Sequence, residues 1–144
     1  VAEGPRRTAA TRALTAADAP AFAATAPAWA LRGWGSFSSL VAFGAAFGVT
    51  HGPGFASLAW IFDQSAGFDS IGVFTVPRYR RLGLGRAAAS ALIAHIARRR
   101  GKVPLWSTPP DNADSIALAR SLGFTEQVTE SLIRWPPRAV GARK

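Results

Sequence analysis

Two arginines and two glycines stand close together in the stretch RRLGLG, from Arg80 to Gly85. Glycines at these positions let backbone N–H groups crowd towards one point, because glycine has no Cβ and tolerates left-handed conformations. A run of small residues with helical character follows directly, and the first turn of a helix adds unpaired N–H donors and its positive dipole end. Such an arrangement binds phosphate oxygens. The pattern therefore predicts an anion site, with Arg80, Arg81 and Arg86 supplying further positive charge.

Two common phosphate-binding patterns fit this turn poorly. The segment GLGRAA satisfies G-x-G-x-x-A, but dinucleotide-binding glycines follow their strand almost directly and precede an acidic residue by about 20 positions. Here PRYRRL separates the glycines from Val76, and the next predicted strand, residues 102–108, carries no carboxylate. A P-loop requires Gly-Lys followed by Ser or Thr, and this combination is absent from the chain.

The composition limits which other chemistry is available. The chain has 144 residues, of which 49% are hydrophobic and 17% charged, which is typical of one globular domain. We therefore expect a single domain over residues 1–144. Cysteine is absent, so disulfides, thiolate metal sites and thiol nucleophiles are excluded. No apolar run reaches the ~18 residues that a membrane span needs, and no signal peptide is visible. We expect a cytoplasmic protein without membrane association.

The formal net charge of +9 indicates an affinity for anions, which includes nucleic acids and phosphorylated cofactors. The arginines form short groups, for example residues 98–100, rather than a stripe interleaved with exposed aromatic residues. Specific nucleic-acid binding is therefore not expected. A monomer and a homodimer both remain open.

Apolar periodicity and turn residues predict alternating strands and helices. Strands are expected over residues 8–14, 45–51, 55–62, 70–76, 102–108 and, once or twice, 125–135. Helices are expected over residues 15–26, 29–43, 84–100 and 112–122, with Thr15 capping the first and Gly123 ending the last. Residues 63–69 are expected to form a loop, and residues 136–144 a loose basic tail.

The run Arg80-x-x-Gly83-x-Gly85 resembles the R/Q-x-x-G-x-G/A signature of the GNAT superfamily of acyl-CoA-dependent N-acyltransferases. The preceding VFTVPRY is similar to the strand, proline and arginine that lead into that signature. Further on, NADSIALARSLGF (residues 112–124) resembles the family's later helix, N-x-x-S/A-x-x-L-x-x-x-L-G-F. Two such motifs in this order are specific, whereas either alone is weak. The segments FGVTHG, SLAW and PLWS are also similar to a bacterial branch associated with self-resistance to aminated antibiotics.

The resemblance implies an α/β (α+β) fold, with a mixed, mostly antiparallel sheet, helices on both faces, and a splayed cleft that binds acetyl-CoA. The pantetheine arm would bind the strand like an extra strand, at Val73, Phe74, Thr75 and Val76. The pyrophosphate would lie on the N–H groups of Leu82, Gly83, Leu84, Gly85, Arg86 and Ala87, within reach of Arg80, Arg81 and Arg86. Asn112 and Ser115 match polar contacts to the cofactor arm, although capping by Asp111 or Asn112 is the simpler interpretation of these residues.

The implied reaction is direct attack of an amine on the acetyl thioester, with no metal. The Val73 N–H is expected to polarise the thioester carbonyl. A base is needed because an amine is mostly protonated at neutral pH. The resemblance points to Asp69, just before the strand, where histone-modifying relatives place a glutamate. Asp63 and His51 are the alternatives, and an ordinary solvated carboxylate is the simpler interpretation of either aspartate.

One position departs from the family pattern. Many relatives carry a tyrosine five residues before the phenylalanine of LGF as the acid for the leaving thiolate, and here that residue is Ala119. Water or Ser115 would have to replace it. A non-catalytic acyl-CoA-binding domain therefore remains the alternative to an N-acetyltransferase that acts on the primary amine of a small molecule. The sequence does not identify the acceptor.

We predict that any binding to duplex DNA is weak, independent of DNA sequence and lost at physiological salt, because it would rest on phosphate contacts alone. Electrophoretic mobility shifts over a salt series measure this. A sequence-specific complex that survives physiological salt would contradict the interpretation.

Overall fold

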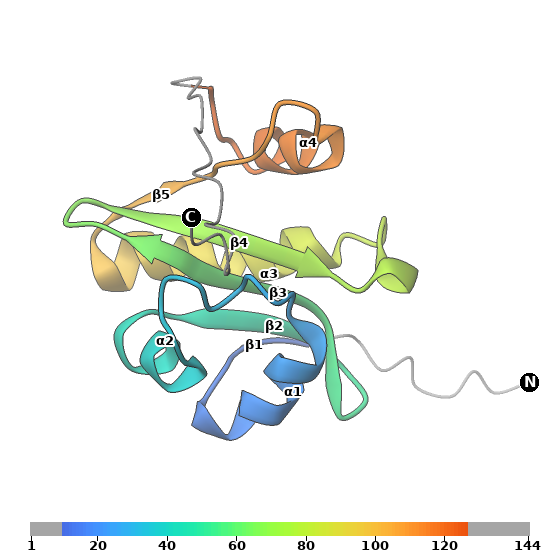
Figure 1. The fold of residues 1–144 in the computed structure, drawn as a ribbon. Coiled ribbons are helices and arrows are strands. Elements are labelled where there is room, and N and C mark those ends of the chain that lie inside the picture. Colours follow the sequence, from blue (N-terminus) through green and yellow to red (C-terminus); the bar gives the residue numbers. More distant parts are fainter. Residues whose placement is uncertain (1–9, 127–144) are drawn as a thin grey trace, which may run out of the picture.

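A five-stranded sheet forms the centre of the computed structural model, which describes residues 10–126 (Figure 1). The strands lie in chain order and are β1 (Thr11–Ala13), β2 (Ala46–His51), β3 (Gly54–Gln64), β4 (Phe68–Thr75) and β5 (Val103–Leu105). Neighbouring strands are antiparallel except β4 and β5, which are parallel. The predicted mixed, mostly antiparallel sheet is confirmed.

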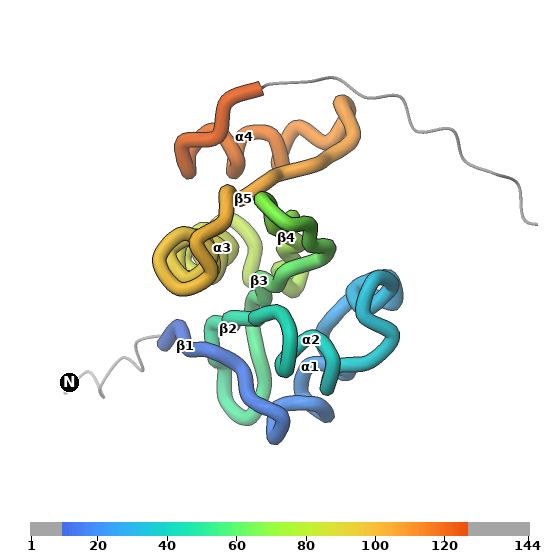
Figure 2. The backbone as a smooth tube through the Cα atoms, turned by 90° about the vertical axis from the view of Figure 1, so that its left-hand side faces the viewer, coloured from blue at the N-terminus to red at the C-terminus, as the bar shows by residue number. Residues whose placement is uncertain are grey.

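Helices cover both faces of this sheet, as predicted (Figure 2). Helix α3 (Leu84–His95) lies on one face, while α1 (Ala19–Thr25) and α2 (Phe37–Phe43) lie on the other. Helix α4 (Ala113–Ser121) lies beyond β5 at the end of the sheet. Within residues 10–126, no helix is both long enough and apolar enough to cross a membrane.

The helix ends follow the capping signals in the sequence. The Asn112 side chain accepts a hydrogen bond from the Ser115 N–H at 3.1 Å, which begins α4, and Gly123 adopts a φ of +94° just beyond its end. Helix α3 continues through a π-helical turn, Ile96–Arg100, so the predicted helix over residues 84–100 is confirmed. The helix predicted over residues 29–43 is shorter, because only its last part forms α2.

The loop predicted over residues 63–69 is wrong in its extent. Strand β3 runs to Gln64 and β4 begins at Phe68, and the Ser65 N–H donates to the Phe68 carbonyl at 2.8 Å to close the hairpin. Asp63 and Gln64 belong to the end of β3 and not to a loop. A register shift between Ile61 and Asp63 lets β3 continue beyond its apolar part. The strand predicted at residues 8–14 is observed as β1, and the strands predicted over 125–135 lie mostly outside the described residues.

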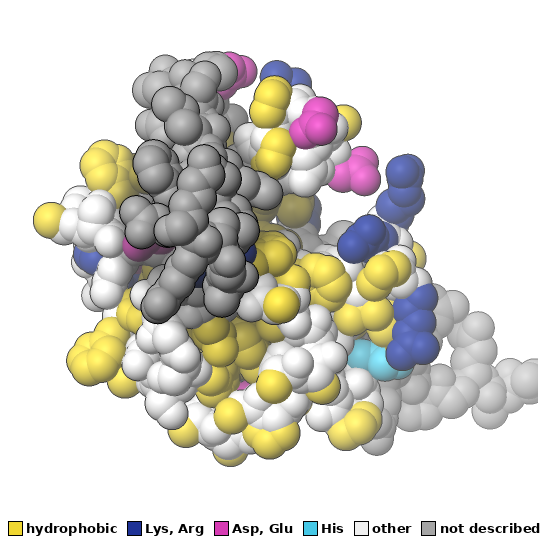
Figure 3. Space-filling model, viewed as in Figure 1, with side chains coloured by type: hydrophobic (Ala, Val, Ile, Leu, Met, Phe, Trp, Pro, Cys, Tyr) yellow, Lys and Arg dark blue, Asp and Glu magenta, His cyan; other side chains and the backbone are white. Residues whose placement is uncertain are grey.

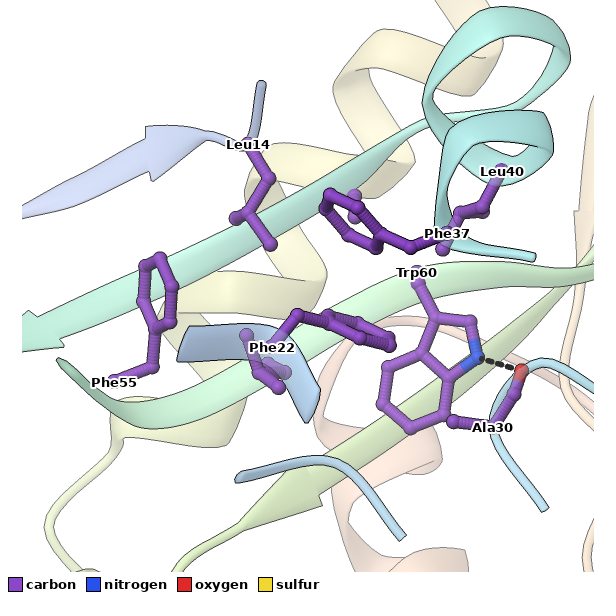
Figure 4. Packing of buried hydrophobic residues seen from close by; sticks show 9 residues of the cluster. Leu14, Phe22, Ala30, Phe37, Leu40, Phe55 and Trp60 are labelled. Carbon is purple, nitrogen blue, oxygen red and sulfur yellow. Dashed lines mark hydrogen bonds between the residues drawn. The ribbon is translucent and has the colours of Figure 1, made fainter. Parts of the chain in front are cut away.

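Trp60 is the largest fully buried side chain and lies on the face covered by α1 and α2 (Figure 4). Its indole N–H donates to the Ala30 carbonyl at 3.1 Å, and its ring meets Phe22 edge-on at 6.0 Å. A second apolar cluster lies between the sheet and α3, where Ala88, Ala89, Leu92 and Ile96 are fully buried. The alanines let the helix approach the strands closely. Strand β4 therefore packs on both faces. The Trp60 cluster contacts it on the side of α1 and α2, and the second cluster contacts it on the side of α3.

We predict that Gly72→Ala destabilises the protein by about 1–3 kcal/mol, the usual effect of overpacking a core. A Cβ at Gly72 would lie 2.7 Å from the Trp60 ring, whose neighbours leave it no room to shift. Gly67→Ala is the matched control, because a Cβ there meets nothing within 4 Å. Urea unfolding of both variants measures the difference, and equal midpoints would contradict this packing.

Candidate active site

Strands β4 and β5 pair only over a short stretch, from Phe68 with Val103 to Ser70 with Leu105. The Val103 N–H donates to the Gly67 carbonyl at 3.0 Å, and the pairing of the two strands ends at Ser70 with Leu105. Strand β4 continues to Thr75, whereas β5 ends at Leu105. Among residues 10–126, the later part of β4 therefore has a strand partner on one side only, β3.

The direction of the β4 backbone groups follows from two hydrogen bonds. The Val76 N–H donates to the Ala56 carbonyl at 2.9 Å, towards β3, and the Thr75 carbonyl accepts from Arg80 Nε at 3.1 Å, away from β3. Successive residues of a strand point their backbone groups to opposite sides, so the Val73 N–H faces away from β3. It points into the space that opens between β4 and the chain after β5 beyond the pair Ser70 and Leu105, here called the split.

Of the four residues predicted to bind pantetheine through their backbone, only two therefore face the split, Val73 and Thr75. The backbone groups of Phe74 and Val76 point to β3, where the Phe74 carbonyl also accepts a hydrogen bond from the Ser57 hydroxyl at 3.3 Å. The prediction for Phe74 and Val76 is corrected on this point.

The glycine turn lies between β4 and α3. Gly83 has a φ of +76° and caps α3, and Arg81 has a φ of +63°, a conformation that is strained for a residue with a side chain. The Ala87 N–H donates to the Gly83 carbonyl at 3.1 Å, so it belongs to the helix and is not available to an anion as predicted. The preceding N–H groups of the first turn of α3, on Leu84, Gly85 and Arg86, have no intrahelical acceptor.

Gly85 brings the turn against the split. A Cβ at this position would lie 3.1 Å from Thr75 Oγ1, 3.6 Å from Val73 Cγ1 and 3.7 Å from Leu118 Cδ2. The start of α3, the unpaired part of β4 and the middle of α4 therefore meet at one place. Leu118 was not predicted to belong to the site, although it lies one helical turn after Ser115 and therefore on the same helix face.

Positive side chains gather at this end of the molecule, over the segment that joins β4 to α3 (Figure 3). Arg80, Arg81 and Arg86 are exposed there. Arg80 is anchored, because its Nε donates to the Thr75 carbonyl and its guanidinium lies 6.0 Å from the centre of the Phe74 ring. Within the described part of the chain, no ion pair with a carboxylate involves these three arginines.

Helix α4 is tied to the end of β5 by a side-chain hydrogen bond. The Trp106 indole N–H donates to Ser115 Oγ at 3.0 Å, and the Ser115 N–H is capped by Asn112. The simpler interpretation of Asn112 as a cap is thus observed, and a cofactor contact by either residue stays a prediction. Ala119, at the position where the resemblance implies a tyrosine, is buried.

The position expected for Asp69 is wrong. Its carboxylate is fully buried and accepts hydrogen bonds from Arg100 Nε at 2.6 Å and Lys102 Nζ at 3.2 Å. It lies in the paired part of β4, four residues and about 13 Å along the strand from Val73. A general base must contact the substrate amine directly or through one water. Asp69 is therefore a structural carboxylate, and we do not retain it as the base.

The alternative proton acceptors lie at opposite ends of β4. Asp63 is exposed and follows the bulge of β3, where it is in register with Ser70 of β4. His51 is exposed in the β2–β3 hairpin, with its ring 4.5 Å from Tyr79. It lines a groove of about 510 Å³ together with Phe74 and Val76, on the sheet face opposite α3. Among residues 10–126, no three His, Cys, Asp or Glu side chains gather in a way that could hold a metal ion.

A parallel strand pair that separates beside a glycine turn at a helix N-terminus is the arrangement that the resemblance to the GNAT superfamily implied. The chain belongs to the GNAT acetyltransferase family, whose family model matches residues 16–130.

Individual relatives agree with this assignment. The uncharacterized N-acetyltransferase YdfB of Bacillus subtilis is 35% identical over 100 residues, which cover 69% of this chain and 38% of YdfB. A GNAT-family crystal structure from Novosphingobium aromaticivorans is 29% identical with a TM-score of 0.66, covering 87% of this chain and 56% of that one. The aminoglycoside N-acetyltransferase AAC(6')-Iy in complex with CoA shares the fold at 18% identity and a TM-score of 0.66, covering 90% and 100% of the two chains. The chain thus spans about two-fifths to just over half the length of the first two relatives.

We predict that the protein loses stability as pH falls below about 6.5, the ordinary pKa of histidine. Burial lowers the pKa of His95 in α3, and the nearby charges of Arg100 and Arg99 lower it further. The unfolded chain therefore takes up this proton at a higher pH than the folded chain, so acid favours unfolding through that window. Urea unfolding of wild type and His95→Gln between about pH 7.5 and 5.5 should give a flatter dependence in the variant; identical slopes would contradict this.

Proposed function

We propose that the protein is an N-acetyltransferase that moves the acetyl group of acetyl-CoA to a primary amine of a small molecule. The observation that carries the proposal is the edge of β4 that no other strand of residues 10–126 pairs with, which leads from the Val73 N–H directly to the glycine turn of α3. A pantetheine arm is an extended chain with amide groups, so it can complete this edge as a strand would.

The phosphates of acetyl-CoA are proposed to bind where the turn enters α3. The free N–H groups of Leu84, Gly85 and Arg86 and the helix dipole favour an anion. The guanidinium groups of Arg80, Arg81 and Arg86 supply the charge for the pyrophosphate and for the further phosphate of the nucleotide. The left-handed conformation of Arg81 supports this proposal, because backbone strain is concentrated at binding sites.

The proposed chemistry is one acyl transfer. The amine nitrogen attacks the thioester carbonyl, a C–N bond forms, the C–S bond breaks, and the CoA thiolate leaves. The Val73 N–H donates to the carbonyl oxygen as negative charge develops on it. The attacking amine loses its proton to His51 or water, because Asp69 is out of reach and Asp63, in register with Ser70, lies about 10 Å along the sheet from Val73.

Ser115 is the proposed hydrogen-bond donor to the leaving thiolate. Its oxygen already accepts the Trp106 N–H at 3.0 Å, so its own proton remains free to be donated. Ser115 precedes Ala119 by one helical turn, which places the two residues on the same face of α4. A hydroxyl here takes over part of the role that the tyrosine of relatives would have.

A non-catalytic acyl-CoA-binding domain is the second candidate, and the absence of a tyrosine at Ala119 favours it. The aminoglycoside enzyme and the bisubstrate complex of the same enzyme make an amine acceptor the first choice to test. The net charge of +9 argues mildly against polycationic acceptors, because like charges repel during encounter. A panel of monoamines and polyamines with acetyl-CoA, followed by release of free thiol, tests the function. Binding of acetyl-CoA without thiol release for any amine would favour the second candidate.

We predict that Gly83→Val abolishes measurable CoA binding in calorimetry, because valine is strained at a φ of +76° and displaces the N–H groups of the turn. Gly35→Val is the matched control. Gly35 has a φ of +74°, and a Cβ at either glycine meets nothing within 4 Å. Both variants should lose about 1–3 kcal/mol of stability, but only Gly83→Val should lose CoA. Unchanged CoA affinity in Gly83→Val would contradict the proposed phosphate site.

A further inference from the structure

We propose that the buried cluster of Asp69, Arg100 and Lys102, here called the Asp69 cluster, is a positioning device for the acyl transfer. It fixes the point at which β5 leaves β4 and thereby the direction in which the Val73 N–H faces the acetyl group. This inference rests on the proposed function. None of the three residues touches the reacting atoms, so they are positioning residues.

The Asp69 carboxylate is the centre of the cluster and has no exposed surface. Arg100 binds it with two nitrogens, Nε at 2.6 Å and Nη2 at 3.3 Å, and Lys102 Nζ donates at 3.2 Å. The two cationic side chains are only 17% and 19% exposed. A carboxylate so deeply buried is stable only when it is paired and hydrogen-bonded, so this geometry is strongly specified.

The cluster joins elements that are far apart in the sequence. Arg100 is the last residue of the π-helical turn after α3, and it also donates to the Phe43 carbonyl at the end of α2 and to the Gln64 side chain at the end of β3, both at 2.9 Å. One guanidinium therefore ties α3, α2, β3 and β4 together. The β4–turn–α3 unit is closed at one end by the glycine turn and at the other by this cluster.

The position of Lys102 explains why the cluster governs the split. Lys102 immediately precedes β5, and Asp69 is in register with Pro104 on that strand. The ion pair holds the start of β5 against β4, one residue before the last register pair, Ser70 with Leu105. Beyond β5, the bond from Trp106 to Ser115 draws the chain towards α4. Two side-chain contacts, one on each side of a three-residue strand, thus set where the strands separate.

The separation point determines the catalytic geometry. If the start of β5 moved away from β4, backbone groups before Ile71 would become unpaired and the site could admit the cofactor arm in more than one register. Displacement of a catalytic donor by about 1 Å can lower the rate about 10²-fold. The glycine turn, where the phosphates are proposed to bind, lies at the other end of β4 and would be unaffected. Loss of the cluster should therefore impair turnover more than binding of the nucleotide end of CoA.

The test compares Lys102→Gln and Arg100→Gln with Arg98→Gln, a control that removes the same charge from an exposed residue of the same helical turn. Hydrogen exchange of the Val103 and Leu105 amides, kcat/KM with acetyl-CoA and one amine, and affinity for adenosine 3′,5′-bisphosphate are measured. In Lys102→Gln we expect at least about 10-fold faster exchange of these amides and about 10- to 100-fold lower kcat/KM. We expect affinity for adenosine 3′,5′-bisphosphate within about twofold of wild type, and wild-type values throughout for Arg98→Gln.

Lys102→Gln leaves the Arg100–Asp69 pair in place, so it decides the matter if Arg100→Gln fails to fold. A folded Lys102→Gln protein with wild-type exchange at β5 and wild-type kcat/KM would overturn the proposal, as would an equal loss in Arg98→Gln. A wild-type protein that turns over no amine would contradict the proposed enzymatic function instead. The exchange measurement would still show whether the cluster fixes β5, because it needs no substrate.

Discussion

The early separation of β5 from β4 is the constraint on which the rest of the site depends. Backbone N–H and C=O groups are obligatory hydrogen-bonding groups, and a strand that loses its neighbour must present them to something else. Beyond Ser70, every second residue of β4 points its backbone groups into the split. Arg80 satisfies the Thr75 carbonyl, while no second strand of residues 10–126 pairs with β4 at Val73. The glycine turn, the arginines and α4 are all arranged around this edge.

Arginine and lysine serve opposite purposes at the two ends of β4. Near the turn, Arg81 and Arg86 are exposed and add positive potential where the helix N-terminus already attracts anions. At the other end, Arg100 and Lys102 surround a buried carboxylate and hold elements together. Sequence composition does not distinguish these charges. Arg81 and Arg86 are exposed to a ligand, whereas Arg100 and Lys102 are paired with a buried carboxylate.

The local conformations around the candidate site were predicted well from the sequence. The glycine turn, the start of α3 and the cap of α4 each follow from a few consecutive residues whose backbone preferences are strong. The role assigned to Asp69 failed because it depended on burial. Its position one residue before an expected strand suggested a solvated loop, whereas pairing with β3 and β5 extends β4 through it and two distant cations enclose it.

The sequence by itself determined the fold class, the family and the glycine turn before α3, since periodicity, glycine placement and ordered motifs are properties of short segments. Tertiary structure alone decided which β4 residues face the split, because the alternation of backbone groups is anchored by the register with β3. It also decided that Ser115 meets Trp106, nine positions away in the chain, and that Asp69 meets Arg100, 31 positions away. Such contacts depend on how whole elements pack, and no local pattern specifies that packing.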